Sequence, residues 1–208
     1  MEYPVFAEPE RYLQKREGRF PIKTWLKRWY ERRALNKCLD RARDVQSICD
    51  IPCGPGRLFD AWKPRVKFVQ GVDLSDDMLH AAKSEHASLG LEGGVRRGNA
   101  FEPEDLPDVD MTCSVRFAYY FEPHKRIELL RSLASRAGKY LIVQYKSLET
   151  RKGRRNAARI PRNNDAYRKH FATHDQIRDE VIEAGLEFLG LYPIAQSSDR
   201  VFVLARVS

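Results

Sequence analysis

The stretch Asp50-Ile-Pro-Cys-Gly-Pro-Gly-Arg57 decides the fold of this 208-residue chain. It lies at the end of an apolar segment, residues 45–51, which we predict to be a buried strand, and a predicted helix near residues 58–62 follows it. Gly54 and Gly56 remove two side chains where the chain must turn tightly and where a ligand can approach the backbone. In an α/β sheet, ligands bind beyond the carboxyl ends of the strands, so we expect this turn to face a ligand.

The alternation of short strands and helices continues on the C-terminal side of this turn. Thr173 and Gln176 have the spacing of a capping box at the start of a helix, and Gly185 ends that helix. The other predicted strands are at 67–72, 94–97, 109–115, 139–145, 186–194 and 200–207, and the other predicted helices at 75–86 and 123–137. This pattern, which closes with a hairpin, predicts a mostly parallel α/β sheet with one antiparallel strand at or near an edge.

The predicted strand at residues 67–72 is followed directly by an acidic residue. The segment Gly71-Val-Asp-Leu-Ser75 places Asp73 seventeen residues after Gly56, where its carboxylate can accept hydrogen bonds from two ribose hydroxyls. The sequence therefore predicts a ligand of the adenosine type. A nicotinamide dinucleotide is disfavoured, because its binding folds use a further glycine beside the pyrophosphate and Phe59 occupies that position.

Together these residues resemble the first motifs of the class I S-adenosylmethionine-dependent methyltransferases, whose first motif usually reads D-x-G-x-G-x-G. The resemblance covers roughly residues 45–145, and Pro52 stands where the first glycine of the motif is expected. It implies a Rossmann-like, seven-stranded sheet with helices on both faces. It also implies S-adenosylmethionine as the cofactor and methyl transfer as the activity.

The same resemblance implies roles for individual residues around the cofactor. Asp50 would lie near the methionine amino group, Asp73 on the ribose and Met78 on the adenine face. Asn99 would lie near the adenine amino group, and Ser114 at a strand tip that faces the transferred methyl group. The full set of expected cofactor-binding residues is Asp50, Pro52, Cys53, Gly54, Gly56, Arg57, Asp73, Leu74, Met78, Asn99, Ala100, Phe101 and Ser114.

Candidate catalytic residues follow the fourth predicted strand or end a later basic segment. Methyl transfer chiefly requires that donor and acceptor are held in line, and a general base only where the acceptor must lose a proton. Arg116 is expected either to hold a phosphate or carboxylate or to pair with a surface acid. His124 and His170 are candidate bases, and His124 also suits a capping or surface role. The candidate set is Arg116, Tyr119, Tyr120, His124 and His170, with Tyr145 and Lys146 expected on the acceptor side of the fifth strand.

The cysteines predict no metal centre. None of the four belongs to a zinc pattern, and Cys49 and Cys53 lack the third cysteine of an iron–sulfur motif because position 56 is glycine. We interpret all four as reduced thiols. Since no apolar run could form a secretory signal or span a membrane, a cytoplasmic location is expected.

The positive charge is concentrated in two segments. The chain has a formal net charge of +8, and residues 11–43 hold 12 Lys or Arg against 3 Asp or Glu, while residues 151–170 hold 8 against 1. The first segment contains a predicted amphipathic basic helix from residue 22 to 42, with Trp25 expected to anchor it to the sheet. Residues 147–171 are predicted to be an insertion without regular structure. The two segments are either solvated surfaces or sites for an anionic partner.

We therefore expect one domain, divided into a basic helix or lid (1–43), a cofactor-binding half (44–146), the basic insertion (147–171) and a C-terminal helix and hairpin (172–208). The expected function is S-adenosylmethionine-dependent methylation, at oxygen, of a small-molecule or lipid-linked acceptor, and both anionic and uncharged acceptors stay open. Nucleic-acid methylation is an alternative. Against it, Ser114-Val-Arg116 differs from the N/D-P-P-Y/F tetrad that is common in enzymes that methylate the amino groups of adenine and cytosine. A non-catalytic S-adenosylmethionine-binding subunit is another alternative, and peripheral membrane contact and oligomeric state stay open.

Overall fold

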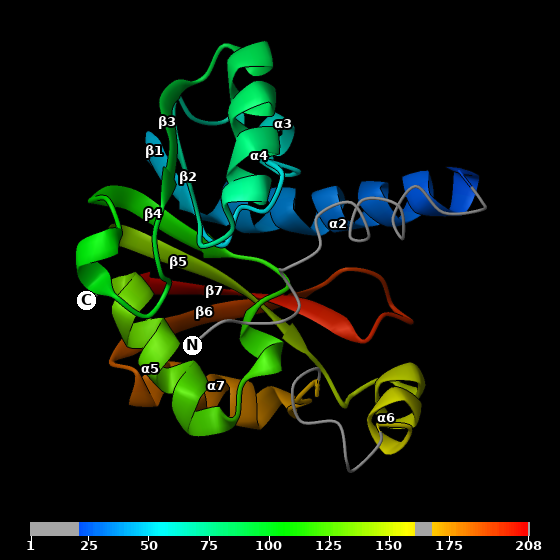
Figure 1. The fold of residues 1–208 in the computed structure, drawn as a ribbon. Helices are drawn as coiled ribbons and strands as arrows, with labels where there is room; N and C mark the ends of the chain where they lie inside the picture. The colour runs from blue at the N-terminus through cyan, green and yellow to red at the C-terminus, as the bar shows by residue number, and fades with distance from the viewer. Residues whose placement is uncertain (1–20, 161–167, 208) are drawn as a thin grey trace.

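The computed structural model describes residues 21–160 and 168–207, and its centre is one seven-stranded sheet in the order β3-β2-β1-β4-β5-β7-β6 (Figure 1). Neighbouring strands from β3 to β5 are parallel, and β7 is antiparallel to both β5 and β6. The predicted, mostly parallel sheet with one antiparallel strand beside an edge is thus confirmed. The strands are β1 (Ser47–Asp50), β2 (Phe68–Asp73), β3 (Glu92–Arg97), β4 (Val109–Ser114), β5 (Ala137–Lys146), β6 (Leu186–Pro193) and β7 (Arg200–Val207).

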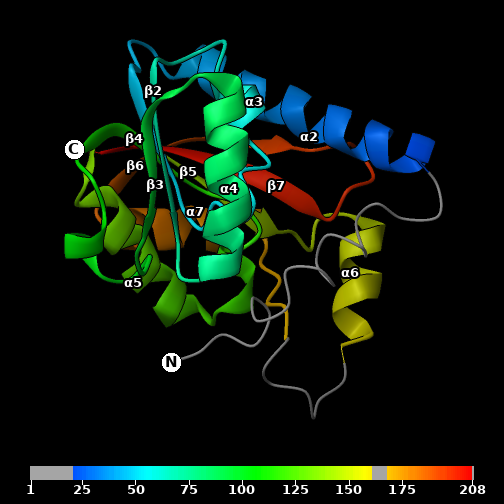
Figure 2. The ribbon, with the colours of Figure 1, turned by 45° about the horizontal axis from the view of Figure 1, so that its top comes forward.

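Helices cover both faces of this sheet, as predicted (Figures 1 and 2). The apolar side chains of α2, α3 and α4 belong to one buried cluster, and those of α5 and α7 to another on the opposite face. The helices are α2 (Pro21–Arg41), α3 (Phe59–Trp62), α4 (Asp76–Leu89), α5 (Pro123–Ala134), α6 (Arg151–Ala158) and α7 (His174–Glu183), with short 3-10 helices η2 (Pro103–Asp105) and η3 (Ala118–Tyr120).

Local sequence signals explain where these helices begin and end. The Ser75 hydroxyl accepts a hydrogen bond from the Met78 N–H at the start of α4, and Gly90 ends α4 in a left-handed conformation. At α7 the capping box predicted from Thr173 and Gln176 is present in both directions. Each cap satisfies backbone groups that the helix itself leaves without partners.

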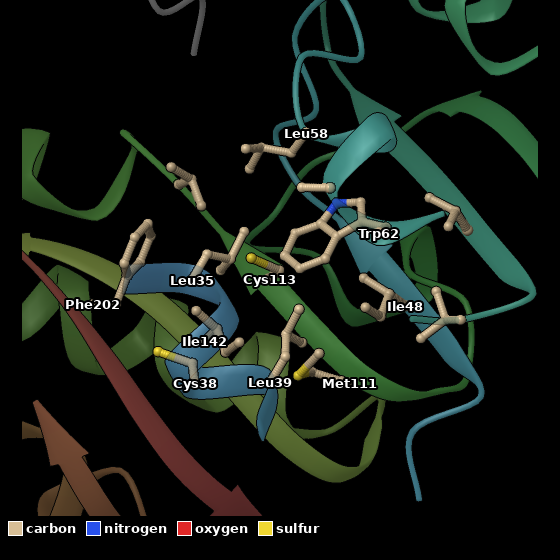
Figure 3. Packing of buried hydrophobic residues seen from close by; sticks show 14 of the residues in the cluster. Leu35, Cys38, Leu39, Ile48, Leu58, Trp62, Met111, Cys113, Ile142 and Phe202 are labelled. Atoms are coloured by element: carbon tan, nitrogen blue, oxygen red, sulfur yellow. The ribbon is translucent and has the colours of Figure 1, made fainter. Parts of the chain in front are cut away.

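The helix α2 forms part of the core. Leu35, Cys38 and Leu39 pack with Trp62 of α3 on buried side chains of β4, β5 and β7, among them Phe202 (Figure 3). Burying a large apolar side chain contributes about 1.5–3 kcal/mol, so these contacts hold the C-terminal half of α2 firmly on the sheet.

The expectation that Trp25 anchors α2 to the sheet is wrong. Trp25 is 63% exposed and Trp29 is 42% exposed. At 100° per residue, the buried stripe that runs through Leu35 and Cys38 does not include these two tryptophans. In addition, the first turns of α2 project past β7 (Figure 2).

The predicted irregular insertion at 147–171 also needs correction, because residues 151–158 form α6. The Thr150 hydroxyl caps this helix by accepting a hydrogen bond from the Gly153 N–H at 3.0 Å. Most side chains of α6 are exposed, so the helix has no apolar period from which it could be predicted. Asn156 ties it to the β6–β7 connection through a 2.9 Å hydrogen bond to Asp199, and residues 161–167 lie outside the described ranges.

Within the part of the chain that the structure describes, no helix combines the length and the apolar character needed to cross a bilayer.

Candidate functional site

Two buried carboxylates lie at the ends of adjacent parallel strands. Asp50 ends β1 and Asp73 ends β2, and the two strands pair directly, so both side chains lie at the carboxyl edge of the sheet. Asp50 is 1% exposed and accepts a hydrogen bond from Trp62 Nε1 at 3.3 Å. Burial raises the pKa of Asp50 to about 7. This carboxyl group therefore exchanges its proton near neutral pH.

Asp73 connects the turn after β1 to the end of β2. One carboxylate oxygen accepts the Gly54 N–H at 2.8 Å, and the other accepts the Ser75 N–H at 3.0 Å. Burial raises the pKa of Asp73, and hydrogen bonds from backbone N–H groups oppose that rise. An ionised carboxylate has about four acceptor positions, so Asp73 retains capacity for the two hydroxyls of a ribose.

The two glycines of the turn have different surroundings. Both have positive φ, +54° at Gly54 and +77° at Gly56. A Cβ atom at Gly54 would meet nothing within 4 Å, whereas one at Gly56 would lie 2.6 Å from the ring of Phe59. Gly54 therefore exposes its backbone to open space, as a ligand-binding turn requires, and Gly56 allows the turn to pack on α3.

The residues expected around adenine lie at the ends of β2 and β3. Met78 is almost wholly buried, Leu74 is exposed, and Ala100 is buried. The Asn99 carboxamide oxygen accepts the Phe101 N–H at 3.1 Å, so this side chain also shapes the loop that it belongs to. The ring of Phe101 packs edge-on against Phe121. These residues thus follow the ends of β2 and β3, the two strand ends on the Asp73 side of the sheet.

Ser114 ends β4, which pairs with β1 on the side away from β2. It is completely buried, and its Oγ finds no hydrogen-bond partner among residues 21–160 and 168–207. A buried hydroxyl without a partner costs about 1–3 kcal/mol. An open glycine backbone, a carboxylate with spare acceptor capacity and this buried hydroxyl thus lie at one edge of the sheet, and the first two fit a nucleoside-containing cofactor.

A second group of charged side chains, from the same edge, surrounds Glu31 of α2. Three arginines, which we call the arginine triad (Arg57, Arg116 and Arg200), donate hydrogen bonds to the Glu31 carboxylate. Arg57 Nη1 lies 2.7 Å from Oε2, Arg116 Nη2 lies 2.8 Å from Oε2, and Arg200 Nη1 lies 3.0 Å from Oε1. Gln144 Nε2 donates to the same carboxylate at 3.3 Å. Glu31 is 1% exposed.

Sequence reasoning places Arg116 and Arg57 near the site but misses Glu31, Gln144 and Arg200. The predicted partner of Arg116, a ligand anion or a surface acid, is instead a buried glutamate from another element. One signal was available: Glu31 lies on the stripe of α2 that otherwise carries apolar residues such as Leu35 and Cys38. An acid on that stripe needs buried positive partners.

The aromatic candidates gather beside the end of β5. Tyr119 is buried, its ring lies 4.8 Å from that of Tyr120, and its carbonyl accepts the His170 N–H at 2.7 Å. Lys146 Nζ lies 5.6 Å from the Tyr119 ring and 5.2 Å from the Phe171 ring. The structure therefore places Tyr119 beside Tyr120 and bonds its carbonyl to the backbone of His170, whose side chain lines a cavity with Arg126 and Glu180 between α5 and α7.

The two candidate histidines, His170 and His124, lie in different environments. Burial lowers the pKa of His170, and the charge of Arg126 adds to this effect. A neutral imidazole is able to accept a proton. His124 lies at the exposed start of α5, with its Nδ1 3.9 Å from a Glu122 oxygen, and its position agrees with the surface role considered for it.

Tyr145 does not face the acceptor side, contrary to expectation. It is buried on the α5–α7 face, where its hydroxyl donates to Glu180 at 3.1 Å beside the Arg126–Glu180 ion pair. Side chains alternate across a strand, so Tyr145 and Lys146 cannot share a face. Lys146 lies on the other face and pairs with Asp199 at 2.6 Å.

The cysteines and acids do not assemble a metal site in the described ranges. Cys38, Cys49, Cys53 and Cys113 are free and buried. No three His, Cys, Asp or Glu side chains within residues 21–160 and 168–207 converge as metal ligands would.

Comparison with known proteins adds a family match and a set of similar folds. The family model of a methyltransferase domain matches residues 48–137, and no curated protein matches this sequence. Among solved structures, the chain is similar to an S-adenosylmethionine-dependent methyltransferase from Clostridium acetobutylicum, with 13% identity, 86% of this chain and 91% of that chain covered, and a TM-score of 0.68.

Two further solved structures share the fold. Magnesium protoporphyrin IX methyltransferase from Synechocystis, solved with bound S-adenosylhomocysteine, has 14% identity and a TM-score of 0.73, with 98% of this chain and 96% of that chain covered. A mitomycin 7-O-methyltransferase has 14% identity and a TM-score of 0.67, with 90% of this chain and 55% of that chain covered. At these identities the likeness is one of fold, and it confirms the predicted Rossmann-like sheet.

Proposed function

We propose that this chain, whose residues 48–137 match the family model of a methyltransferase domain, is a class I S-adenosylmethionine-dependent methyltransferase that methylates an oxygen atom of a small-molecule acceptor. The observation that carries the proposal is the placement of Asp50 and Asp73 at the ends of adjacent strands, with the open turn residue Gly54 donating its N–H to Asp73. Solved relatives of this fold include proteins named for small-molecule acceptors, one of them methylated at oxygen.

The residues at the carboxyl edge are suited to S-adenosylmethionine, which supplies a methyl group on a positively charged sulfur. Asp73 would accept hydrogen bonds from the ribose hydroxyls, and the Gly54 backbone would lie against the ligand. Asp50 would face the methionine amino group. Leu74, Met78, Asn99, Ala100 and Phe101 would flank the adenine, and Ser114 would lie nearest the reacting centre.

The candidate base is His170, which lines a cavity with Arg126 and Glu180 between α5 and α7. As the acceptor oxygen forms its bond to the methyl carbon, the carbon–sulfur bond breaks and the hydroxyl proton must leave. His170, neutral because burial lowers its pKa, would accept that proton. Tyr119 and Tyr120 would hold the acceptor in line, and positioning of this kind can supply about 7–11 kcal/mol of barrier reduction.

A screen with methyl-labelled S-adenosylmethionine tests the proposal. The purified chain is incubated separately with polar small molecules, lipids and RNA, and label is expected in the small-molecule fraction. Label in lipid would assign a lipid-linked acceptor, and label in RNA would support the nucleic-acid alternative. Bound cofactor without label in any fraction would favour the non-catalytic subunit.

The open space at Gly54 leads to a prediction with a matched control. Gly54→Val should abolish S-adenosylmethionine binding, because its side chain would fill the space where the ligand meets the backbone. Gly90→Val is the control, since Gly90 also has a positive φ, +61°, and a Cβ atom there would likewise meet nothing within 4 Å. Both variants bear the same backbone strain, so similar losses of thermal stability are expected. Calorimetric binding should separate them, and cofactor binding by Gly54→Val would show that this turn does not face the ligand.

The raised pKa of Asp50 predicts a pH dependence. Between pH 6 and 7.5 the ionised fraction of a group with pKa about 7 rises roughly eightfold, so the dissociation constant of S-adenosylmethionine should fall by about that factor. In the ligand-free protein the sign is opposite: the native state retains a proton that the unfolded state loses, so stability should decrease as pH rises from about 4 to 7. Asp50→Asn should remove both effects, and an unchanged pH profile in that variant would assign them to another group.

A further inference from the structure

We infer that the arginine triad binds an anionic group, a carboxylate or a phosphate, of the methyl acceptor, and this inference rests on the proposed methyltransferase function. Three guanidinium groups, which are always protonated, converge on one carboxylate. Among residues 21–160 and 168–207, Glu31 is the acidic side chain within 4.0 Å of Arg57, Arg116 and Arg200. Within that distance, three positive charges thus share one negative charge, and Asp50, at a greater distance, also interacts with Arg57.

The positive groups are the more exposed part of this cluster. Glu31 is 1% exposed, whereas the side chains of Arg57, Arg116 and Arg200 are 17%, 25% and 19% exposed. Each guanidinium has five N–H donors, and Glu31 uses one nitrogen of Arg57, one of Arg200 and two of Arg116. Glu31 thus holds the triad from the buried side, and other N–H donors of these partly exposed side chains are not used by Glu31.

The triad also lies where an acceptor must bind. Arg57 directly follows the glycine turn after β1, Arg116 is the second residue after β4, and Arg200 begins β7. Since β7 is antiparallel to β5, its first residue lies at the same edge as the last residues of β1 and β4. This is the edge that carries Asp50 and Ser114.

The fixed geometry makes the triad a better anion site than three mobile surface arginines. Planar guanidinium groups bind carboxylate and phosphate oxygens in pairs. Here a buried glutamate, to which Gln144 also donates a hydrogen bond, already holds them in place, so less conformational entropy is lost when an anion arrives. Nearby Lys146 is paired with Asp199, and it adds no further surplus charge.

Arg200→Gln is the sharpest test, because Arg200 is separated in sequence from the cofactor turn. Arg206→Gln is its matched control: Arg206 lies on the same strand, at the other end, in an exposed ion pair with Glu187 at 2.9 Å. With S-adenosylhomocysteine bound, the wild type should bind succinate or inorganic phosphate in a calorimetric titration, and the better probe identifies the anion. Arg200→Gln should weaken this binding at least tenfold, and Arg206→Gln should leave it unchanged.

Turnover gives a second measurement. Labelled products should come from the small-molecule fraction that an anion exchanger retains. In Arg200→Gln, the KM for the acceptor should rise while kcat stays nearly unchanged. Equal probe binding by the two variants, or label confined to uncharged acceptors, would overturn the inference. So would a tenfold loss of S-adenosylhomocysteine affinity in Arg200→Gln, because the triad would then hold the cofactor's own carboxylate.

Two further results keep the test decisive. If Arg200→Gln does not fold, as judged by circular dichroism, Arg200→Lys retains the charge but loses the paired donor geometry, and it should still weaken probe binding. Failure of the wild type to bind S-adenosylmethionine or S-adenosylhomocysteine would contradict the proposed function itself. That outcome differs from cofactor binding without anion binding, which contradicts the role of the triad alone.

Discussion

Replacing Glu31 with alanine is expected to lower the free energy of unfolding by about 3–5 kcal/mol, the cost of breaking a buried ion pair by removing one partner. The substitution leaves Arg57, Arg116 and Arg200 close together without the carboxylate that they share. Their mutual repulsion and incomplete hydration would then oppose the docking of α2. Urea denaturation monitored by circular dichroism measures the loss.

Asp40→Ala is the control for this experiment. Asp40 lies on the same helix and pairs with Arg65 at 2.7 Å, but both side chains are exposed. An exposed pair contributes about 0–1 kcal/mol, so this variant should unfold almost like the wild type. Equal and small effects of the two substitutions would mean that the Glu31 cluster does not hold α2 in place.

Replacing Asp73 with alanine is expected to abolish stabilisation by S-adenosylmethionine. At about 100 times its dissociation constant, a ligand adds about 2.7 kcal/mol to stability, and the wild type should show this as a raised melting temperature. The variant loses the acceptor of the ribose hydroxyls and also the bond that positions the Gly54 N–H. NAD should stabilise neither protein.

Asp110→Ala is the control that distinguishes a loss of intrinsic stability from a loss of cofactor binding in Asp73→Ala. The Asp110 carboxylate also accepts two backbone N–H groups, from Gln46 at 2.7 Å and Ser47 at 3.2 Å. It does so at the start of β1, the opposite edge of the sheet from Asp73. Both variants should lose intrinsic stability, but Asp110→Ala should keep its full response to the cofactor. A normal thermal shift in Asp73→Ala would contradict the role assigned to Asp73.

The cofactor side of the site could be predicted from the sequence because it depends on local order. Each strand, turn and helix between β1 and β4 follows the previous one along the chain, and parallel strands place their last residues at one edge. Asp50, Gly54 and Asp73 could therefore be placed together before any tertiary contact was known. Their hydrogen bonds and burial agree with that placement.

The Glu31 cluster could not be predicted in this way. Its members come from α2, the first turn, the end of β4, β5 and the start of β7, and only the strand order brings them together. A glutamate within a basic helix gives no sign of which arginines it will meet. The error at Tyr145 has a related origin, since the strand itself was predicted but not which face each side chain takes.

The helix α6 was missed for another reason. It is held by its Thr150 cap and by the bond between Asn156 and Asp199, rather than by an apolar face. Hydrophobic periodicity, the main signal for helices, reports burial. A helix that buries almost nothing gives no such signal.

The hydrogen bond between Glu31 and Arg200 joins residues 169 positions apart in the chain, and this separation bears on the order of folding. Leu35 of α2 and Phe202 of β7 also share one apolar cluster. Contacts between such distant segments form late and slow the search for the native state, because a long loop must close before they contribute. During synthesis, α2 leaves the ribosome well before β7. Until β7 follows, the carboxylate of Glu31 and the apolar stripe around Leu35 are exposed to water. The edge proposed to bind the cofactor and the acceptor is therefore complete only when the final strand has joined the sheet.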